Sequence, residues 1–197
     1  MFEKIANTLQ QEAQDLLHNK GLWQTLLSKG NIHVTGSSYL DLLVFPDLDV
    51  YFEAQNSNDV IDVFADTAKS FIKNKDVTSV ELEKELYKRY TQVPKGIVLQ
   101  CRFNNGHRLW KIDIWAIEDP QVLTKNMQEM QAFKNQLTSK QREIILEAKH
   151  TLAKPFGRTP VGSSYLVYKA VLEEGINDVG QIIAWIRNQG GNVDKLK

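Results

Sequence analysis

The chain has 197 residues, of which 42% are hydrophobic, with 24 acidic residues against 24 lysines and arginines and a single cysteine. This length is enough for a domain with its own hydrophobic core, and the balanced charge argues against a general nucleic-acid-binding protein, which is normally basic. One cysteine excludes an internal disulfide, and the absence of a signal-peptide pattern or a long apolar run leads us to expect a soluble, cytoplasmic protein.

The first part of the chain alternates between helical and strand-like patterns. Apolar residues at three- and four-residue steps predict helices over residues 2–20 and 60–73, with an extension over 22–27. Short apolar runs between turn residues predict strands. These strands are residues 31–35, 48–53, 77–86, 97–103 and 109–117. The run 77–86 alternates like a strand, although its Glu and Lys content would also suit a helix.

After residue 119 the apolar period becomes helical and stays so. Helices are predicted over residues 120–135, 139–152, 163–175 and 178–190. The chain therefore divides into a sheet-bearing part, residues 1–119, and a helical region, residues 120–197. The predicted fold class is α+β: a mixed sheet of about five strands with flanking helices, followed by a C-terminal helical layer.

Two aspartates stand one residue apart at the start of the strand predicted over residues 48–53. Because successive side chains in a strand alternate between faces, Asp47 and Asp49 point the same way, while Leu48 and Val50 point into the core. Two neighbouring carboxylates repel each other unless a cation lies between them. Hard divalent cations such as Mg²⁺ prefer oxygen ligands of this kind, so the pair predicts a metal site.

A Gly-Ser turn precedes the aspartate pair. Gly36 would let the backbone approach a ligand closely, and Ser37 opens a short predicted helix whose N–H groups suit a phosphate. Ser37 would be a helix cap, a phosphate donor or both. The segment Gly36-Ser37-Ser38-Tyr39-Leu40 recurs as Gly162-Ser163-Ser164-Tyr165-Leu166. We interpret the second copy as a helix cap, with a second phosphate contact as the alternative.

A third aspartate, Asp113, stands in the strand predicted over residues 109–117. Alternation puts Lys111, Asp113 and Trp115 on one face of this strand. The flanking residues are apolar and include two tryptophans, where an unpaired charge would be costly to bury. Asp113 is therefore predicted to be a ligand rather than an idle surface charge.

Gly36-Ser37, an intervening turn of helix and then Asp47-x-Asp49 between apolar residues resemble the signature of the nucleotidyltransferase superfamily. That superfamily includes DNA polymerase beta and the antibiotic nucleotidyltransferases, and its members carry a third carboxylate on a later strand, where this chain has Asp113. Because these parts occur together at the family's spacing, they are more specific than Asp-x-Asp alone. The resemblance covers roughly the first 120 residues. It is the strongest functional signal in the sequence.

The resemblance implies magnesium-dependent nucleotidyl transfer. Asp47 and Asp49 would bind two Mg²⁺ ions. Asp113 would bind the ion that activates the acceptor and would be placed to take its proton, and Gly36 and Ser37 would hold the pyrophosphate end. An NMP, AMP in our prediction, would move from an NTP to a hydroxyl acceptor with release of pyrophosphate. The chain looks most similar to the aminoglycoside and lincosamide adenylyltransferases, so we expect a small-molecule acceptor, with no membrane or general nucleic-acid partner.

Basic residues gather where the helical region begins. They are Lys140, Arg142, Lys149, Lys154 and Arg158. Arg142 and Lys149 lie seven residues apart and would share a helix face, so we predict that both contact the nucleotide. The alternative is a solvated helix face. Asp41 and Glu53 are interpreted as solvated carboxylates outside the site.

Two other classes of protein remain open at this stage. One is a non-catalytic or antitoxin-like nucleotide-binding module that retains the fold. The other is a sugar-nucleotide glycosyltransferase, which also uses Asp-x-Asp with a metal, although it would not need Gly36-Ser37 at this spacing. The acceptor and the NTP are not determined by the residues.

Overall fold

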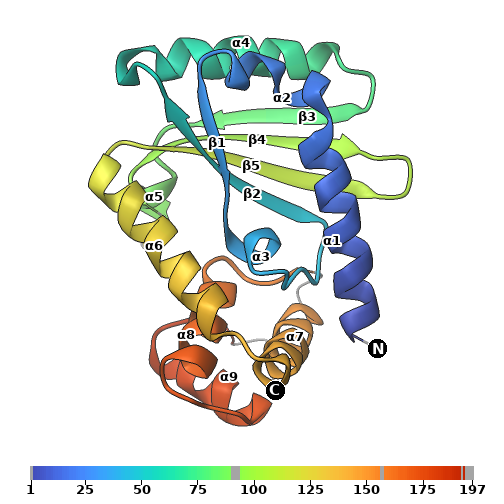
Figure 1. The fold of residues 1–197 in the computed structure, drawn as a ribbon, viewed down its shortest axis with the longest axis vertical. Coiled ribbons are helices and arrows are strands. Elements are labelled where there is room, and N and C mark those ends of the chain that lie inside the picture. Colours follow the sequence, from blue (N-terminus) through green and yellow to red (C-terminus); the bar gives the residue numbers. More distant parts are fainter. Residues whose placement is uncertain (1, 90–93, 156–157, 192, 194–197) are drawn as a thin grey trace.

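The computed structural model describes residues 2–89, 94–155, 158–191 and 193 (Figure 1). Within these ranges five strands form one mixed sheet in the order β1-β2-β5-β4-β3. The strands are β1 Gly30–Val34, β2 Asp47–Ala54, β3 Val77–Glu83, β4 Gly96–Asn104 and β5 Leu109–Ile117. Strands β2 and β5 are parallel, and the other neighbours in the sheet are antiparallel. The predicted mixed sheet is confirmed.

Helices surround the sheet and form a separate layer beyond it. They are α1 Phe2–His18, α2 Lys20–Leu27, α3 Gly36–Tyr39, α4 Val60–Lys73, α5 Leu86–Arg89, α6 Pro120–Gln136, α7 Ser139–Ala153, α8 Ser163–Leu172 and α9 Val179–Asn188, with a short 3-10 turn at Ser57–Asp59. Figure 1 shows α7, α8 and α9 gathered at the opposite end of the molecule from α4. The fold is therefore α+β with a C-terminal helical layer, as the sequence predicts. None of the helices in the described ranges is long and apolar enough to cross a membrane.

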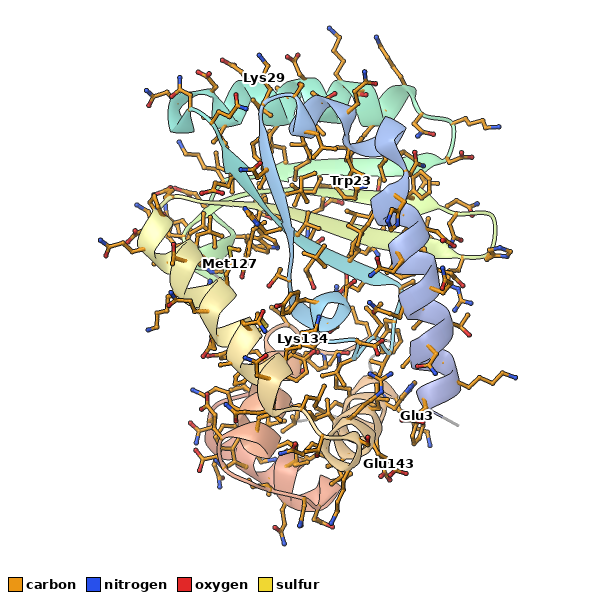
Figure 2. All side chains as sticks on the ribbon, viewed as in Figure 1. Glu3, Trp23, Lys29, Met127, Lys134 and Glu143 are labelled. Atoms are coloured by element: carbon orange, nitrogen blue, oxygen red, sulfur yellow. The ribbon has the colours of Figure 1, made fainter. Side chains whose placement is uncertain are left out.

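One hydrophobic cluster lies between the sheet and helices α1, α2 and α4. Leu48, Val50 and Phe52 of β2 are buried in it, because alternation turns them away from Asp47 and Asp49. Trp23 of α2 is buried in the same cluster, where its indole Nε1 donates a hydrogen bond to the carbonyl of Leu16 over 2.9 Å (Figure 2). This packing leaves the opposite face of the sheet available for polar side chains.

A second cluster joins α7, α8 and α9. Leu40, Leu42 and Val44, which follow α3, are buried in this cluster together with Ala6 of α1. Lys134 of α6 also lies beside α3 (Figure 2), with its ammonium 4.3 Å from the centroid of the Tyr39 ring. The segment after α3 thus connects the sheet to the helical layer. The division of the chain into two parts at residue 119 stays a prediction.

The end of β3 differs from the sequence-based prediction. The strand stops at Glu83, and the short helix α5 begins at Leu86, which was assigned to the strand. Strand β3 is the edge of the sheet and pairs only with β4 in the described part of the chain. An edge strand exposes much of its side-chain surface to water, which is why a Glu- and Lys-rich run is tolerated there.

Candidate active site

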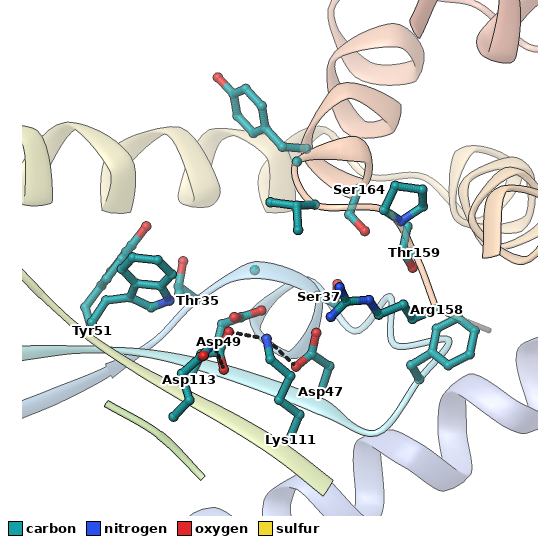
Figure 3. A pocket seen from close by; sticks show the side chains of 18 of the residues that line it. Thr35, Ser37, Asp47, Asp49, Tyr51, Lys111, Asp113, Arg158, Thr159 and Ser164 are labelled. Carbon is teal, nitrogen blue, oxygen red and sulfur yellow. Dashed lines mark hydrogen bonds and ion pairs between the residues drawn. The ribbon is translucent and has the colours of Figure 1, made fainter. Parts of the chain in front are cut away.

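The parallel pairing of β2 with β5 places Asp49 directly beside Asp113. Asp47 shares their face of the sheet, and one carboxylate oxygen of each of the three residues lies within 4.8 Å of the others. Figure 3 shows the three side chains converging from the two strands. The structure thus brings together the three aspartates that the motif singled out.

These aspartates lie on the floor of a cavity of about 760 Å³. The sheet forms the floor, and the segment that leads into α8 forms the opposite wall. Figure 3 shows Arg158 and Ser164 pointing from this wall into the cavity. A volume of this size is typical of small-molecule and cofactor pockets and is large enough for a nucleoside triphosphate.

The carboxylates present the features of a divalent-cation site. Asp47 Oδ1 is buried and accepts no hydrogen bond from any described residue. Burial, reinforced by the neighbouring charges of Asp47 and Asp113, raises the pKa of the Asp49 carboxyl well above its ordinary value. A bound Mg²⁺ would offset the repulsion between the carboxylates and coordinate Asp47 Oδ1, which accepts no hydrogen bond within the described ranges. The residues therefore fit a hard divalent cation.

Lys111 belongs to the carboxylate cluster. Its ammonium forms an ion pair with Asp113 and lies 3.6 Å from Asp47 Oδ1. Burial lowers the pKa of Lys111, but the charges of Asp47, Asp113 and Asp49 outweigh burial and raise it. The sequence analysis placed Lys111 on the same face as Asp113 without giving it a role. Strand alternation was the signal that could have identified it.

Gln100 of β4 is a second site residue that the sequence did not reveal. It is the register partner of Asp113, and its Nε2 donates a hydrogen bond to Asp113 Oδ1 over 3.0 Å. Burial raises the pKa of Asp113, while Lys111 and the Gln100 hydrogen bond act against this rise. No sequence spacing links residues 100 and 113, because their contact depends on the register of the β4–β5 hairpin.

Gly36 brings the backbone against the carboxylates. Its φ is +60°, and a Cβ built at this position would lie 3.0 Å from Asp49 Oδ2. The backbone N–H of Thr35 donates to the carbonyl of Asp49 over 3.1 Å, which holds the turn against β2. Glycine is therefore required here both by the left-handed conformation and by the close approach.

Lys149 reaches the site from α7 but is fully buried, with 1% of its surface exposed. Its Nζ donates hydrogen bonds to Ser37 Oγ at 2.7 Å, the Leu42 carbonyl at 2.6 Å and the Tyr168 hydroxyl at 3.0 Å. Burial lowers the pKa of Lys149 to about 7, against the opposing charges of Asp49 and Asp47. Lys149 thus meets the cavity at Ser37, and its predicted contact with nucleotide stays a prediction.

Arg142 is not brought to the cavity. Its guanidinium donates to the carbonyl of Asp41, lies 3.0 Å from Asp41 Oδ2 and donates to Asn7 Oδ1 over 3.1 Å. The N-terminal part of α7, with Arg142, therefore faces α1 and the end of α3. The C-terminal part of α7, with Lys149, faces Ser37. Asp41 lies outside the cavity lining, as expected, and its half-exposed carboxylate pairs with Arg142. Glu53 lies outside the cavity lining and pairs with His33.

The repeated Gly-Ser-Ser-Tyr segment contributes to both walls. Gly162 is the N-cap of α8 with a φ of 76°, in agreement with the interpretation as a cap. Ser164 and Tyr165 nevertheless line the cavity across from Gly36 and Ser37. The recurrence of the motif was therefore a signal for the second wall, which the sequence analysis kept only as an alternative.

No protein-family model and no curated protein matches the chain. Solved structures do match it. The chain is similar to the poly(A) polymerase in a GLD-2–GLD-3 complex (TM-score 0.55, 16% identity, 87% of this chain and 57% of that one). It is also similar to the RNA terminal uridylyl transferase Cid1 (TM-score 0.57, 14% identity, 85% and 47%) and to a GLD-2/RNP-8 structure (TM-score 0.52, 15% identity, 98% and 63%).

These neighbours have the DNA polymerase beta-like nucleotidyltransferase fold. The likeness shows that this chain has the same fold, as the motif around Asp47 and Asp49 predicts. The chain spans between 47% and 63% of the length of the three solved chains.

Proposed function

We propose that this chain is a nucleotidyltransferase that moves an NMP, AMP in the first instance, from an NTP to the hydroxyl group of a small molecule and releases pyrophosphate. The observation that carries the proposal is the convergence of Asp47, Asp49 and Asp113 within 4.8 Å on the floor of a nucleotide-sized cavity. The fold alone would also suit a non-catalytic module, but such a module would have no need for three repelling carboxylates.

The residues around the cavity have separate roles in this proposal. The side chain of Ser37 and the wall that contains Ser164 bind the phosphates. Asp47 and Asp49 would hold Mg²⁺, which would supply positive charge to the triphosphate. The acceptor oxygen attacks the α-phosphorus, and the bond from that phosphorus to the bridging oxygen of the pyrophosphate breaks. The proton of the acceptor hydroxyl passes to Asp113, which lies beside Asp49 across the β2–β5 pair.

A small acceptor is favoured over a long polyanion. The chain has no net charge, with 24 basic and 24 acidic residues, and Glu81 and Glu83 of β3 line the cavity beyond Gln100. Carboxylates at that edge would repel the phosphodiester backbone of a nucleic acid. An RNA 3′-hydroxyl is the second candidate acceptor, and it is supported by the fold likeness to a poly(A) polymerase and to an RNA terminal uridylyl transferase.

The test is transfer of label from NTPs that are radiolabelled on the α-phosphate. The full chain would be incubated with Mg²⁺ and each of the four NTPs, starting with ATP and then UTP. One arm contains a set of hydroxylated small molecules and the other a short RNA. Pyrophosphate release with a labelled small-molecule product is the expected result. Labelled, lengthened RNA would instead favour the RNA acceptor.

Two controls separate transfer from its alternatives. Asp49→Asn should abolish label transfer, whereas Asp66→Asn, an exposed charge change on α4, should leave it intact. Mg²⁺-dependent NTP binding without pyrophosphate release in either arm would replace the proposal with a non-catalytic nucleotide-binding module. Binding of a UDP-sugar in preference to every NTP would favour the glycosyltransferase reading.

A further inference from the structure

The three carboxylates of the site are not equivalent. Both oxygens of Asp113 have partners, since Gln100 donates to Oδ1 over 3.0 Å and the Lys111 ammonium contacts Oδ2. Asp47 Oδ1 has no hydrogen-bond donor among the described residues. The ion pairs of Lys111 are with Asp113 and, at 3.6 Å, with Asp47 rather than with Asp49. A positive charge is thus already provided on the Asp113 side of the cluster.

We propose that Lys111 is a tethered cation that competes with a divalent ion for Asp113. In the nucleotide-free protein one divalent ion binds, on Asp47 and Asp49, and Asp113 becomes a metal ligand only after Lys111 has moved away. This inference rests on the proposed function, because it concerns the metal ions of the same site. It adds an order of binding to the two ions that the family resemblance implied.

The geometry of β5 keeps Lys111 in this position. Lys111 and Asp113 are two residues apart on one strand, so their side chains leave the same face next to each other. The side chain of Lys111 is 19% exposed and that of Asp113 is 6% exposed, so water screens their attraction only weakly. In the nucleotide-free protein, the strand therefore places the ammonium within reach of the Asp113 carboxylate.

Charge balance gives the expected number of ions. Three ionised carboxylates carry three negative charges, and Lys111 carries one positive charge, which leaves a net charge of minus two. One divalent ion neutralises this remainder, and a second would leave the cluster positively charged. A nucleoside triphosphate brings further negative charge, which would attract the second ion and offer the flexible Lys111 ammonium a new partner.

The test is a titration of the nucleotide-free full chain with Mn²⁺, in which unbound ion is measured by electron paramagnetic resonance. The wild type should bind one ion. Lys111→Met should bind two, or bind the first about tenfold more tightly, because the competing charge is gone. Lys111→Arg keeps the charge and should still bind one ion. Lys69→Met, which removes an exposed lysine from α4, should behave as the wild type.

Thermal unfolding shows whether the Lys111→Met variant is folded. Without metal its melting temperature should fall, since three neighbouring carboxylates then lack a counter-charge, and Mn²⁺ should raise it by more than in the wild type. Equal stoichiometry and equal affinity in wild type and Lys111→Met would overturn the inference, as would two ions of similar affinity in the wild type. Either result would leave the proposed function standing. Failure of every variant, wild type included, to bind Mn²⁺ would overturn both.

Discussion

Asp49 and Asp113 are register partners across the parallel β2–β5 pair, so two carboxylates project side by side from neighbouring strands. Burial is the main cause of the raised pKa of each, and the charges of neighbouring carboxylates add to it in both. This pairing costs the folded protein stability unless a cation compensates.

Asp49→Asn should affect the stability of the metal-free protein and its metal binding in opposite directions. The raised pKa of Asp49 means that stability is lost as pH rises from the ordinary value of 3.8 through the folded-state value, because the folded protein must then release a proton that the unfolded chain has already lost. The amide removes this loss, so the metal-free variant should have a higher unfolding free energy than the wild type at pH 7. Chemical denaturation measures the gain.

The same variant should lose Mn²⁺ binding and label transfer, because the amide lacks the charge that ligation needs. Asp66→Asn on α4 is the matched control. Asp41→Asn, the more obvious neighbour, is unsuitable because Asp41 pairs with Arg142. Unchanged Mn²⁺ affinity in Asp49→Asn would show that the metal site lies elsewhere.

Gly36→Ala should impair both folding and the site. The left-handed φ of +60° makes any side chain unfavourable by about 1–2 kcal/mol. The new methyl group would also lie 3.0 Å from Asp49 Oδ2 and displace that carboxylate. Gly106→Ala is a matched control, because Gly106 has a φ of +87° with nothing within 4 Å. Both variants should lose stability, but only Gly36→Ala should weaken Mn²⁺ binding, as titration would reveal.

Arg142→Met tests whether this arginine contacts nucleotide. In the structure it ties α7 to Asp41 and Asn7, so its loss should lower the free energy of unfolding by about 1–3 kcal/mol. NTP affinity should not change. Asp41→Asn combined with Arg142→Met should cost less than the sum of the two, because they share one ion pair. A fall in NTP affinity at unchanged stability would restore the original prediction.

Lys149 should make stability depend on pH near neutrality. Between about pH 7 and the ordinary value of 10.5, the unfolded chain holds a proton on Lys149 that the folded protein has released. Stability should therefore rise with pH in this window, by at most about 1.4 kcal/mol per pH unit. Denaturation between about pH 7 and pH 8 keeps most of the Cys101 thiol, whose ordinary pKa is 9.0, protonated in the unfolded chain. Lys149→Met should remove this slope, whereas Lys154→Met, an exposed neighbour, should retain it.

Local patterns in the sequence were sufficient to predict several of the strands and helices and the faces that their side chains occupy. Alternation in residues 47–52 determined which side chains of β2 enter the core and which enter the cavity. The helical period over residues 60–73 predicted α4 with the bounds that the structure has. Gly36, Asp47 and Asp49 at their spacing, together with Asp113 on a later strand, carried the family resemblance that predicted the fold. The first two inferences depend on interactions within one element, which short-range sequence patterns encode.

Contacts between distant elements could only be decided by the tertiary structure. The β4–β5 register brings Gln100 to Asp113, and the docking of α7 buries Lys149 beneath Ser37. The same docking turns Arg142, seven residues earlier on the same helix, towards Asp41 instead. A helical period specifies which residues of a helix share a face, but it does not specify what that face contacts. The contacts can come from distant parts of the chain, as in the hydrogen bond between Lys149 and Ser37, which are 112 positions apart.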